Sequence, residues 1–205
     1  MIVSTYIGSG DVASLMAGTD SKAYLTLLQR FVSDQIPYRN AKESPIDALR
    51  TGAILEDRFF LTLDDSWFAQ YYVQSHEMDV FKATLDFAQL ADGKVTDFIE
   101  LKTVGFNDYL TYVQPIRDDN DKLLEFLRKK HKPYYLQVQE QLYCTGLQQA
   151  RLCFLSVTSY DDDENYERII KPNEYTFVTV RRDDKVIEQI KKRGTIFQEI
   201  KNNLN

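Results

Sequence analysis

The sequence predicts a single domain, residues 1–205, with an α+β or mixed α/β core. Segments with helical spacing of apolar residues are followed by segments rich in aromatic and β-branched residues, in the order helices, strands, helices, strands, helix. The chain is 43% hydrophobic and 13% aromatic, which is enough to bury one substantial core. It contains no internal repeat, low-complexity tract or obvious linker that would divide it.

Polar caps followed by apolar residues at helical spacing predict six helices. The third has Pro45 in its first turn, where proline is well tolerated. In the second, we expect Leu25, Leu28 and Val32 to form the buried side. The first five ranges are 12–16, 21–32, 44–60, 122–130 and 133–146, and a last helix follows Asp183-Asp184 and carries Val186, Ile190, Ile196 and Ile200.

Five segments predict β-strands, because β-branched and aromatic residues dominate them. Their ranges are 67–74, 81–86, 95–104, 150–158 and 174–182. Asp92-Gly93-Lys94 supplies a turn between the second and third, so we expect these two strands to form a hairpin. We expect Asp161-Asp162-Asp163-Glu164 to be an exposed acidic loop.

The predicted hairpin brings together Asp86, Glu100 and Lys102. Because side chains alternate along a strand, Glu100 and Lys102 share one face while Ile99 and Leu101 point the other way. Two carboxylates supply hard oxygen ligands for Mg²⁺, with water and phosphate in the other positions. The lysine could orient or deprotonate an attacking water and offset phosphate charge. A purely structural ion pair on a solvated sheet is the alternative that this pattern leaves open.

Two helices carry polar groups that could join this cluster. Gly52 and Glu56 lie four residues apart and so share a face. A glycine inside a helix costs stability, which indicates a close approach by another group. On a later helix, Tyr134, Gln137 and Gln141 share one face. The ordinary alternatives are a packing glycine, an exposed glutamate and half-exposed amides.

The formal net charge of −6 argues against a protein that coats nucleic acid by charge alone, since such binding needs many phosphate contacts. Basic residues are nevertheless gathered in the run Arg128-Lys129-Lys130-His131-Lys132 and in the smaller run Lys191-Lys192-Arg193. Each run is either a DNA contact or a solvated helix end.

Several observations bear on cellular location. No apolar run approaches the roughly 20 residues that a membrane span requires, and residues 1–6 lack the basic start of a signal peptide. Cys144 and Cys153 lie in apolar surroundings and predict buried, reduced thiols, because two cysteines without other clustered ligands make no zinc or iron–sulfur site. We therefore expect a cytoplasmic protein with no membrane partner.

In their order along the chain, these motifs resemble the YqaJ and lambda-exonuclease branch of the PD-(D/E)XK nucleases. The resemblance covers almost the whole chain, including the strand at 175–178 and the start of the last helix at 182–184. Its most specific pieces are Glu100-Leu101-Lys102 and Gln137-Val138-Gln139. The motifs that carry it are Ile7-Gly8-Ser9-Gly10-Asp11-Val12-Ala13, Gly52-x-x-x-Glu56, Asp86, Glu100-Leu101-Lys102 and the segment from Tyr134 to Gly146.

The resemblance implies a restriction-endonuclease-like core, with a central mixed β-sheet flanked by helices. It implies a 5′→3′ exonuclease that acts on duplex DNA with free ends in phage-type recombination, in the host-cell cytoplasm if the protein is phage-encoded. The implied partners are a single-strand annealing protein and further copies of the chain in a ring. A structure-selective endonuclease with the same centre, and a DNA-binding scaffold that has lost turnover, are the alternatives.

The resemblance also assigns roles to individual residues. Asp86 and Glu100 would bind Mg²⁺, for which Mn²⁺ could substitute, with help from the Leu101 carbonyl. Glu56 would add a carboxylate for a second ion or its waters. Lys102 would act on the nucleophilic water and Gln137 would hold the lysine or the water in place. The expected DNA contacts are Ser9, Gly10, Tyr134, Arg128, Lys129 and Lys130.

The sequence departs from this family in three places. Near the N-terminus the family tends to place serine directly before the acidic residue, whereas this chain has Ser9-Gly10-Asp11. The first aspartate stands in Leu85-Asp86-Phe87, where the family often has Pro-Asp-Gly. The upstream arginine that family members use on the terminal phosphate has no match, because residues 1–7 contain none. The iron–sulfur branch of these nucleases requires four cysteines, and this chain has two.

Overall fold

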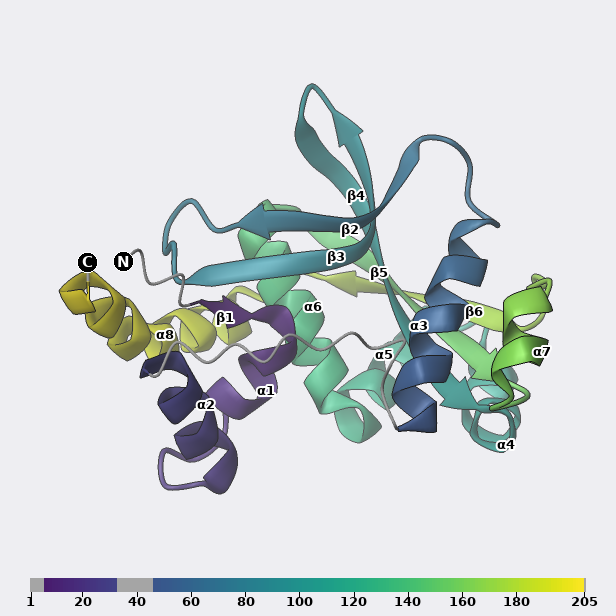
Figure 1. Ribbon diagram of the computed structural model, residues 1–205, viewed down its shortest axis with the longest axis horizontal. Coiled ribbons are helices and arrows are strands. Elements are labelled where there is room, and N and C mark those ends of the chain that lie inside the picture. The colour runs from purple at the N-terminus through teal and green to yellow at the C-terminus, as the bar shows by residue number, and fades with distance from the viewer. Residues whose placement is uncertain (1–5, 33–45, 205) are drawn as a thin grey trace.

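The computed structural model describes residues 6–32 and 46–204, which form a six-stranded sheet with helices on both faces (Figure 1). The strand order is β1-β3-β4-β5-β6, with β2 on the other side of β3. The β1–β3 and β4–β5 pairs are parallel and the other pairs are antiparallel, so the predicted mixed sheet is confirmed. The strands are β1 (Ile7–Gly8), β2 (Trp67–Gln74), β3 (Phe81–Ala91), β4 (Lys94–Gly105), β5 (Gln149–Val157) and β6 (Tyr175–Arg181).

The helices lie close to their predicted ranges, with an additional helical stretch directly after β4. The helices are α1 (Val12–Leu15), α2 (Lys22–Val32), α3 (Asp47–Phe60), α4 (Phe106–Asp108), α5 (Asn120–Lys130), α6 (Lys132–Thr145), α7 (Asp162–Glu167) and α8 (Asp184–Leu204). Short turns of tighter or wider helix are η1 (Ser9–Asp11), η3 (Tyr109–Val113) and η4 (Gln114–Ile116). Asp119 caps α5 by accepting a hydrogen bond from Lys122 N, as a helix N-cap is expected to do.

The strands β3 and β4 form the predicted hairpin and then separate. Their pairing runs from the turn at residues 92–93 as far as Phe87 and Ile99. Beyond that point β4 pairs with β5, whereas β3 stays beside β2 and, at Phe81 and Lys82, beside β1. Figure 1 shows the two strands diverging, with α6 behind the opening. We call this opening the fork.

Two hydrophobic cores lie on the two faces of the sheet. The larger core packs α1, α2, α5, α6 and α8 against one face and includes Phe98 and Val104 of β4. The smaller core packs α3 against the other face and includes Ile99 and Leu101. The side chains of β4 therefore alternate as predicted, which directs Glu100 and Lys102 away from the smaller core.

The predicted buried side of α2 is wrong for Leu25 and Val32, which are 50% and 52% exposed. Leu28 is half-buried against the larger core, and the buried residues of α2 are Tyr24, Leu27 and Phe31. The rings of Tyr24 and Phe31 pack edge-on against Phe197 of α8, with centroids 5.9 and 5.0 Å apart. Both faces of α2 are apolar. The face with the aromatic residues packs against the core, because aromatic side chains bury more area.

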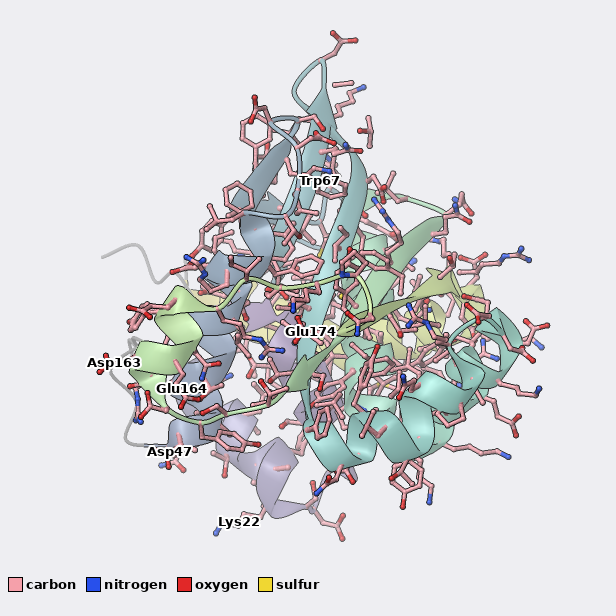
Figure 2. The ribbon with its side chains drawn as sticks, turned by 90° about the vertical axis from the view of Figure 1, so that its right-hand side faces the viewer. Lys22, Asp47, Trp67, Asp163, Glu164 and Glu174 are labelled. Atoms are coloured by element: carbon pink, nitrogen blue, oxygen red, sulfur yellow. The ribbon has the colours of Figure 1, made fainter. Side chains whose placement is uncertain are left out.

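The prediction of an acidic loop at 161–164 is also wrong, because this segment begins α7. Asp161 accepts a hydrogen bond from Glu164 N and so caps the helix. Figure 2 shows Asp163 and Glu164 of α7 beside the end of α3 that carries Asp47. Arg50 of α3 forms an ion pair with Asp162 that joins the two helices. The predicted start of α3 at Ser44-Pro45 lies outside the described residues.

Both cysteines are buried free thiols, as expected. No helix in residues 6–32 or 46–204 is long and apolar enough to cross a membrane.

Candidate active site

Asp86, Glu100 and Lys102 meet at the fork between β3 and β4. Because Phe87 pairs with Ile99, Asp86 lies level with Glu100. No ladder continues here, and the Leu101 N–H donates instead to Asp86 Oδ2, at 2.7 Å. The fork therefore places two carboxylates and one ammonium together, as the sequence predicted.

The Glu100 carboxylate is fully buried and surrounded by donors. Its Oε1 accepts hydrogen bonds from Lys102 Nζ and Gln137 Nε2, and its Oε2 accepts one from Gln141 Nε2. Burying a carboxylate costs little only when such donors replace its water. Gln137 thus lies in the site as expected, bound to the carboxylate as well as close to Lys102.

Gln141 is the site residue whose importance sequence reasoning missed. Its amide nitrogen donates both to Glu100 and to the Thr84 carbonyl of β3, so one side chain bridges the two arms of the fork. The signal was its spacing of four residues from Gln137, which puts both amides on one face of α6. Tyr134, one turn earlier, lies with its ring centroid 5.4 Å from Lys102 Nζ.

Glu56 reaches the site from α3 and is held by Gln70 of β2, whose Nε2 lies 3.2 Å from Glu56 Oε2. Gln70 has a φ of 53°, a left-handed conformation that side chains other than glycine adopt at a cost. It lies level with Asp86 in the β2–β3 pair. A strained residue beside the carboxylates suggests that its position serves the site. At Gly52 of α3 an added Cβ would lie 3.7 Å from the Thr103 hydroxyl of β4, an ordinary contact distance, so the close approach expected there is not seen.

These residues open into one cleft of about 610 Å³, which we call the acidic cleft. It also receives Ser9 and Gly10 from η1, as expected, and Lys82 from β3, which the sequence did not single out. Lys82, Thr84 and Asp86 line it as alternate residues of one strand. Its lining residues are Tyr6, Gly8, Ser9, Gly10, Asp11, Glu56, Gln70, Tyr72, Lys82, Thr84, Asp86, Glu100, Lys102 and Gln137.

The electrostatics of the site follow from burial and from crowded charge. Burial raises the pKa of Asp86 well above its ordinary value, and the charges of Glu100 and Glu56 raise it further. Burial alone would lower the pKa of Lys102, but Glu100 and Asp86 outweigh that effect and raise it. Lys102 is therefore an ammonium group at neutral pH, which suits it to donate hydrogen bonds.

The donor set fits a magnesium ion that is shared with substrate. Within the described residues, no three His, Cys, Asp or Glu side chains surround a single point as a closed metal site. Mg²⁺ is usually bound by one or two carboxylates, with waters and substrate phosphates completing the octahedron. Asp86 and Glu100 supply two carboxylates. The pKa of Asp86 is raised first by burial and then by repulsion from Glu100 and Glu56, and a cation would offset that repulsion.

Three residues of the basic run, Arg128, Lys129 and Lys130 at the end of α5, do not line the acidic cleft. The Arg128 guanidinium donates to Tyr135 Oη at 3.0 Å and lies over the Tyr135 ring, and Lys129 pairs with Glu125. Lys130 is exposed. The structure therefore brings together the predicted metal and catalytic residues with Ser9 and Gly10, and leaves Arg128, Lys129 and Lys130 elsewhere.

Comparison with solved structures identifies similar folds. The alkaline exonuclease LHK-Exo from Laribacter hongkongensis matches with a TM-score of 0.63 at 18% identity, over 97% of this chain and 88% of that chain. LHK-Exo in complex with dAMP matches with a TM-score of 0.62 at 19% identity, with the same coverage. A phage-related exonuclease from Haemophilus somnus 129PT matches with a TM-score of 0.60 at 16% identity, over 97% and 94%.

No protein-family model matches the sequence, and no curated protein matches it. At this level of identity the solved structures establish the fold. The predicted fold, a central mixed sheet flanked by helices, is therefore confirmed, and it is similar to the fold of these exonuclease structures.

Proposed function

We propose that this chain is a Mg²⁺-dependent deoxyribonuclease that degrades duplex DNA from its ends in the 5′→3′ direction, in phage-type recombination. The observation that carries the proposal is the fork, where Asp86, Glu100 and Lys102 meet in an open cleft. The fold supports it, since the similar structures are those of an alkaline exonuclease and a phage-related exonuclease.

Asp86 and Glu100 would hold the ion, with the Leu101 carbonyl and Glu56 as further oxygen ligands for it, its waters or a second ion. When bound, Mg²⁺ supplies a nucleophilic water at neutral pH and stabilises charge on the phosphate oxygens. Mn²⁺ suits the same carboxylate and water ligands, so it should substitute. Glu100 would remain anchored by Gln137 and Gln141, which fixes its orientation toward the cleft.

Lys102 would act as a fixed cation beside the reacting phosphate. Its ammonium can donate to a phosphate oxygen or to the attacking water, and its pKa favours this donor role. Gln137 would fix the position of the Glu100 carboxylate relative to Lys102, because it donates to the same carboxylate oxygen as the lysine. Preorganised donors of this kind stabilise charge that develops in the transition state.

The end of the DNA strand would lie at the opposite side of the acidic cleft, near Ser9 and Gly10. Lys82 provides a cation there, with its Nζ 5.0 Å from the Tyr6 ring centroid. A single lysine recognises a phosphate less selectively than the bidentate fork of an arginine. We therefore expect digestion from 5′ ends with only a modest preference for a terminal phosphate over a hydroxyl, measured as the ratio of initial rates.

An assay with three duplexes tests the proposal. Linear DNA labelled at the 5′ end, linear DNA labelled at the 3′ end and nicked circular DNA are incubated with Mg²⁺, with Mn²⁺ and with EDTA. We expect metal-dependent release of the 5′ label as nucleotides. Cleavage of nicked circles at the same rate would indicate an endonuclease, and early release of the 3′ label would overturn the polarity. DNA binding without turnover would indicate a scaffold.

Two partners remain proposals from the resemblance. We propose that copies of the chain assemble into a ring around DNA, which sedimentation of the purified protein would test. We also propose a single-strand annealing protein as a functional partner in the cytoplasm, because a 5′→3′ exonuclease leaves a single strand for such a protein to bind.

A further inference from the structure

A second cleft, of about 810 Å³, is lined by residues of α1 and the segment after it, together with residues of α6 and α8. We call it the basic cleft, since Lys132 of α6 and Lys192 and Arg193 of α8 line it, and no aspartate or glutamate among the described residues does. Its lining residues are Ala13, Met16, Ala17, Thr19, Tyr24, Lys132, Pro133, Leu136, Gln189, Lys192, Arg193 and Ile196. Positive charge is thus concentrated in this cleft, although the chain as a whole has a net charge of −6.

In the part of the chain that the structure describes, the three cations of the basic cleft have no acidic partner. In residues 6–32 and 46–204, none of the three forms an ion pair, whereas the adjacent Lys191 is paired with both Glu77 and Glu188. Lys132 and Lys192 are exposed. Within the described residues, no acidic side chain neutralises their charge, which could therefore attract an anion.

The two clefts share their dividing wall. On α6, Leu136 lines the basic cleft and its neighbour Gln137 lines the acidic cleft. On the N-terminal side, Asp11 lines the acidic cleft and Ala13 lines the basic cleft. The two clefts are therefore neighbours along α6 and along the N-terminal segment.

We propose that the basic cleft binds the phosphodiester backbone of the DNA substrate next to the end that the acidic cleft cleaves. This inference rests on the proposed function and assigns a substrate-binding site to it. The described lining of the acidic cleft has four carboxylates and two lysines, so we expect much of the affinity for a polyanion to come from cations outside it. The aliphatic floor formed by Met16, Leu136 and Ile196 suits the apolar edges of sugars and bases, and reads no sequence.

The inference predicts a specific change in salt dependence. The combined variant Lys132→Gln, Lys192→Gln and Arg193→Gln should weaken binding of a fluorescent 20-base-pair duplex, measured by anisotropy in EDTA, by about tenfold or more at low salt. The slope of log affinity against log salt concentration should become shallower by about 2–3, since each lost phosphate contact removes about 0.9. The loss should be similar for duplexes of unrelated sequence.

A matched control removes the same charge elsewhere. The variant Lys94→Gln, Lys171→Gln and Lys185→Gln changes three exposed lysines that line neither cleft. It should bind DNA with the wild-type slope, which excludes a simple effect of net charge. A rival variant replaces Arg128, Lys129 and Lys130 with glutamine. If this rival, and not the basic-cleft variant, flattens the slope, the assignment is overturned.

Two further outcomes are distinguishable. In the first, the basic-cleft variant keeps the wild-type salt slope for DNA but no longer binds poly-glutamate, which the wild type binds. This result would identify an acidic polypeptide as the occupant and overturn the DNA assignment. Wild-type protein that binds DNA through this cleft but digests none in Mg²⁺ would overturn the proposed function and leave this binding site standing.

Discussion

Two glutamates are fully buried, Glu100 at the fork and Glu140 on helix α6, and they differ in how many hydrogen-bond donors surround them. Glu100 of β4 accepts hydrogen bonds from Lys102, Gln137 and Gln141. Glu140 of α6 accepts one weak hydrogen bond, from the Cys144 thiol at 3.1 Å, and its Oε2 has no partner among the described residues. Both side chains are completely inaccessible.

The difference shows what donors do for a buried carboxyl group. Around Glu100, two amides and an ammonium replace the lost water and fix the group toward the acidic cleft. Around Glu140, burial raises the pKa well above its ordinary value, and the negative charges of Asp11 and Glu100 add to that rise. The surroundings of the first glutamate supply donors for a carboxylate, whereas those of the second favour its protonated form.

Among the variants that test this contrast, Glu100→Gln should have the largest effect on activity. It keeps the shape of the side chain and removes its charge. We expect DNA degradation to fall by at least about 10³-fold, because a metal ligand and the partner of Lys102 are lost together. Asp86→Ala should have a comparable effect. Degradation of labelled linear duplex in Mg²⁺ measures both, and circular dichroism checks the fold. Digestion at the wild-type rate by either variant would remove these residues from the metal site.

Lys102→Met should lower turnover by about 10²-fold while Mn²⁺ binding, measured by calorimetry, stays close to that of the wild type. The reason is that the ammonium acts on water and phosphate, whereas the carboxylates hold the ion. If Lys102→Met loses metal affinity as strongly as Glu100→Gln does, Lys102 belongs to a structural ion network.

Sequence reasoning found the parts of this site that depend on local pattern. Alternation along one strand and a three-residue turn suffice to bring Glu100 and Lys102 beside Asp86. Gln70 could not be found in this way, because its role depends on the register of β2 with β3 and on a φ of 53°. The bridge made by Gln141 depends on how α6 docks into the fork, which no local pattern encodes.

The same limit explains the errors in the fold. The periodicity of α2 offers two apolar faces, and only the position of Phe197 on α8 selects the one with Tyr24 and Phe31. The run Arg128–Lys130 was the strongest basic signal in the sequence. The basic cleft instead combines Lys132 with Lys192 and Arg193, which are about sixty residues away. Charges that converge from two helices are visible only once both helices are placed.

A third test compares two replacements of Gln70. Both Gln70→Gly and Gln70→Ala remove the amide that holds Glu56, so both should reduce the rate of DNA degradation. Glycine adopts the left-handed conformation without a steric cost, whereas alanine retains that cost. We therefore expect the glycine variant to be more stable than the alanine variant by about 1 kcal/mol in urea unfolding. Equal stability would mean that the backbone relaxes when the glutamine is removed.

Glu140→Gln, the same change at the other buried glutamate, should have the smallest effect. The folded-state pKa of Glu140 is raised, so its contribution to stability is fully present below the unfolded-state value near 4.5 and is lost as the pH rises through the folded-state value. Glutamine cannot ionise and has no such loss. At pH 7–8 the variant should therefore melt about 2–4 °C above the wild type, a gain of about 1 kcal/mol, and the gap should close near pH 4.5.

A constant gap across this range, or a variant that melts lower at pH 8, would mean that Glu140 is ionised in the folded protein. Since Glu140 lines neither cleft, the rate of DNA degradation should stay near that of the wild type, and the two glutamates would then differ in function as they differ in surroundings.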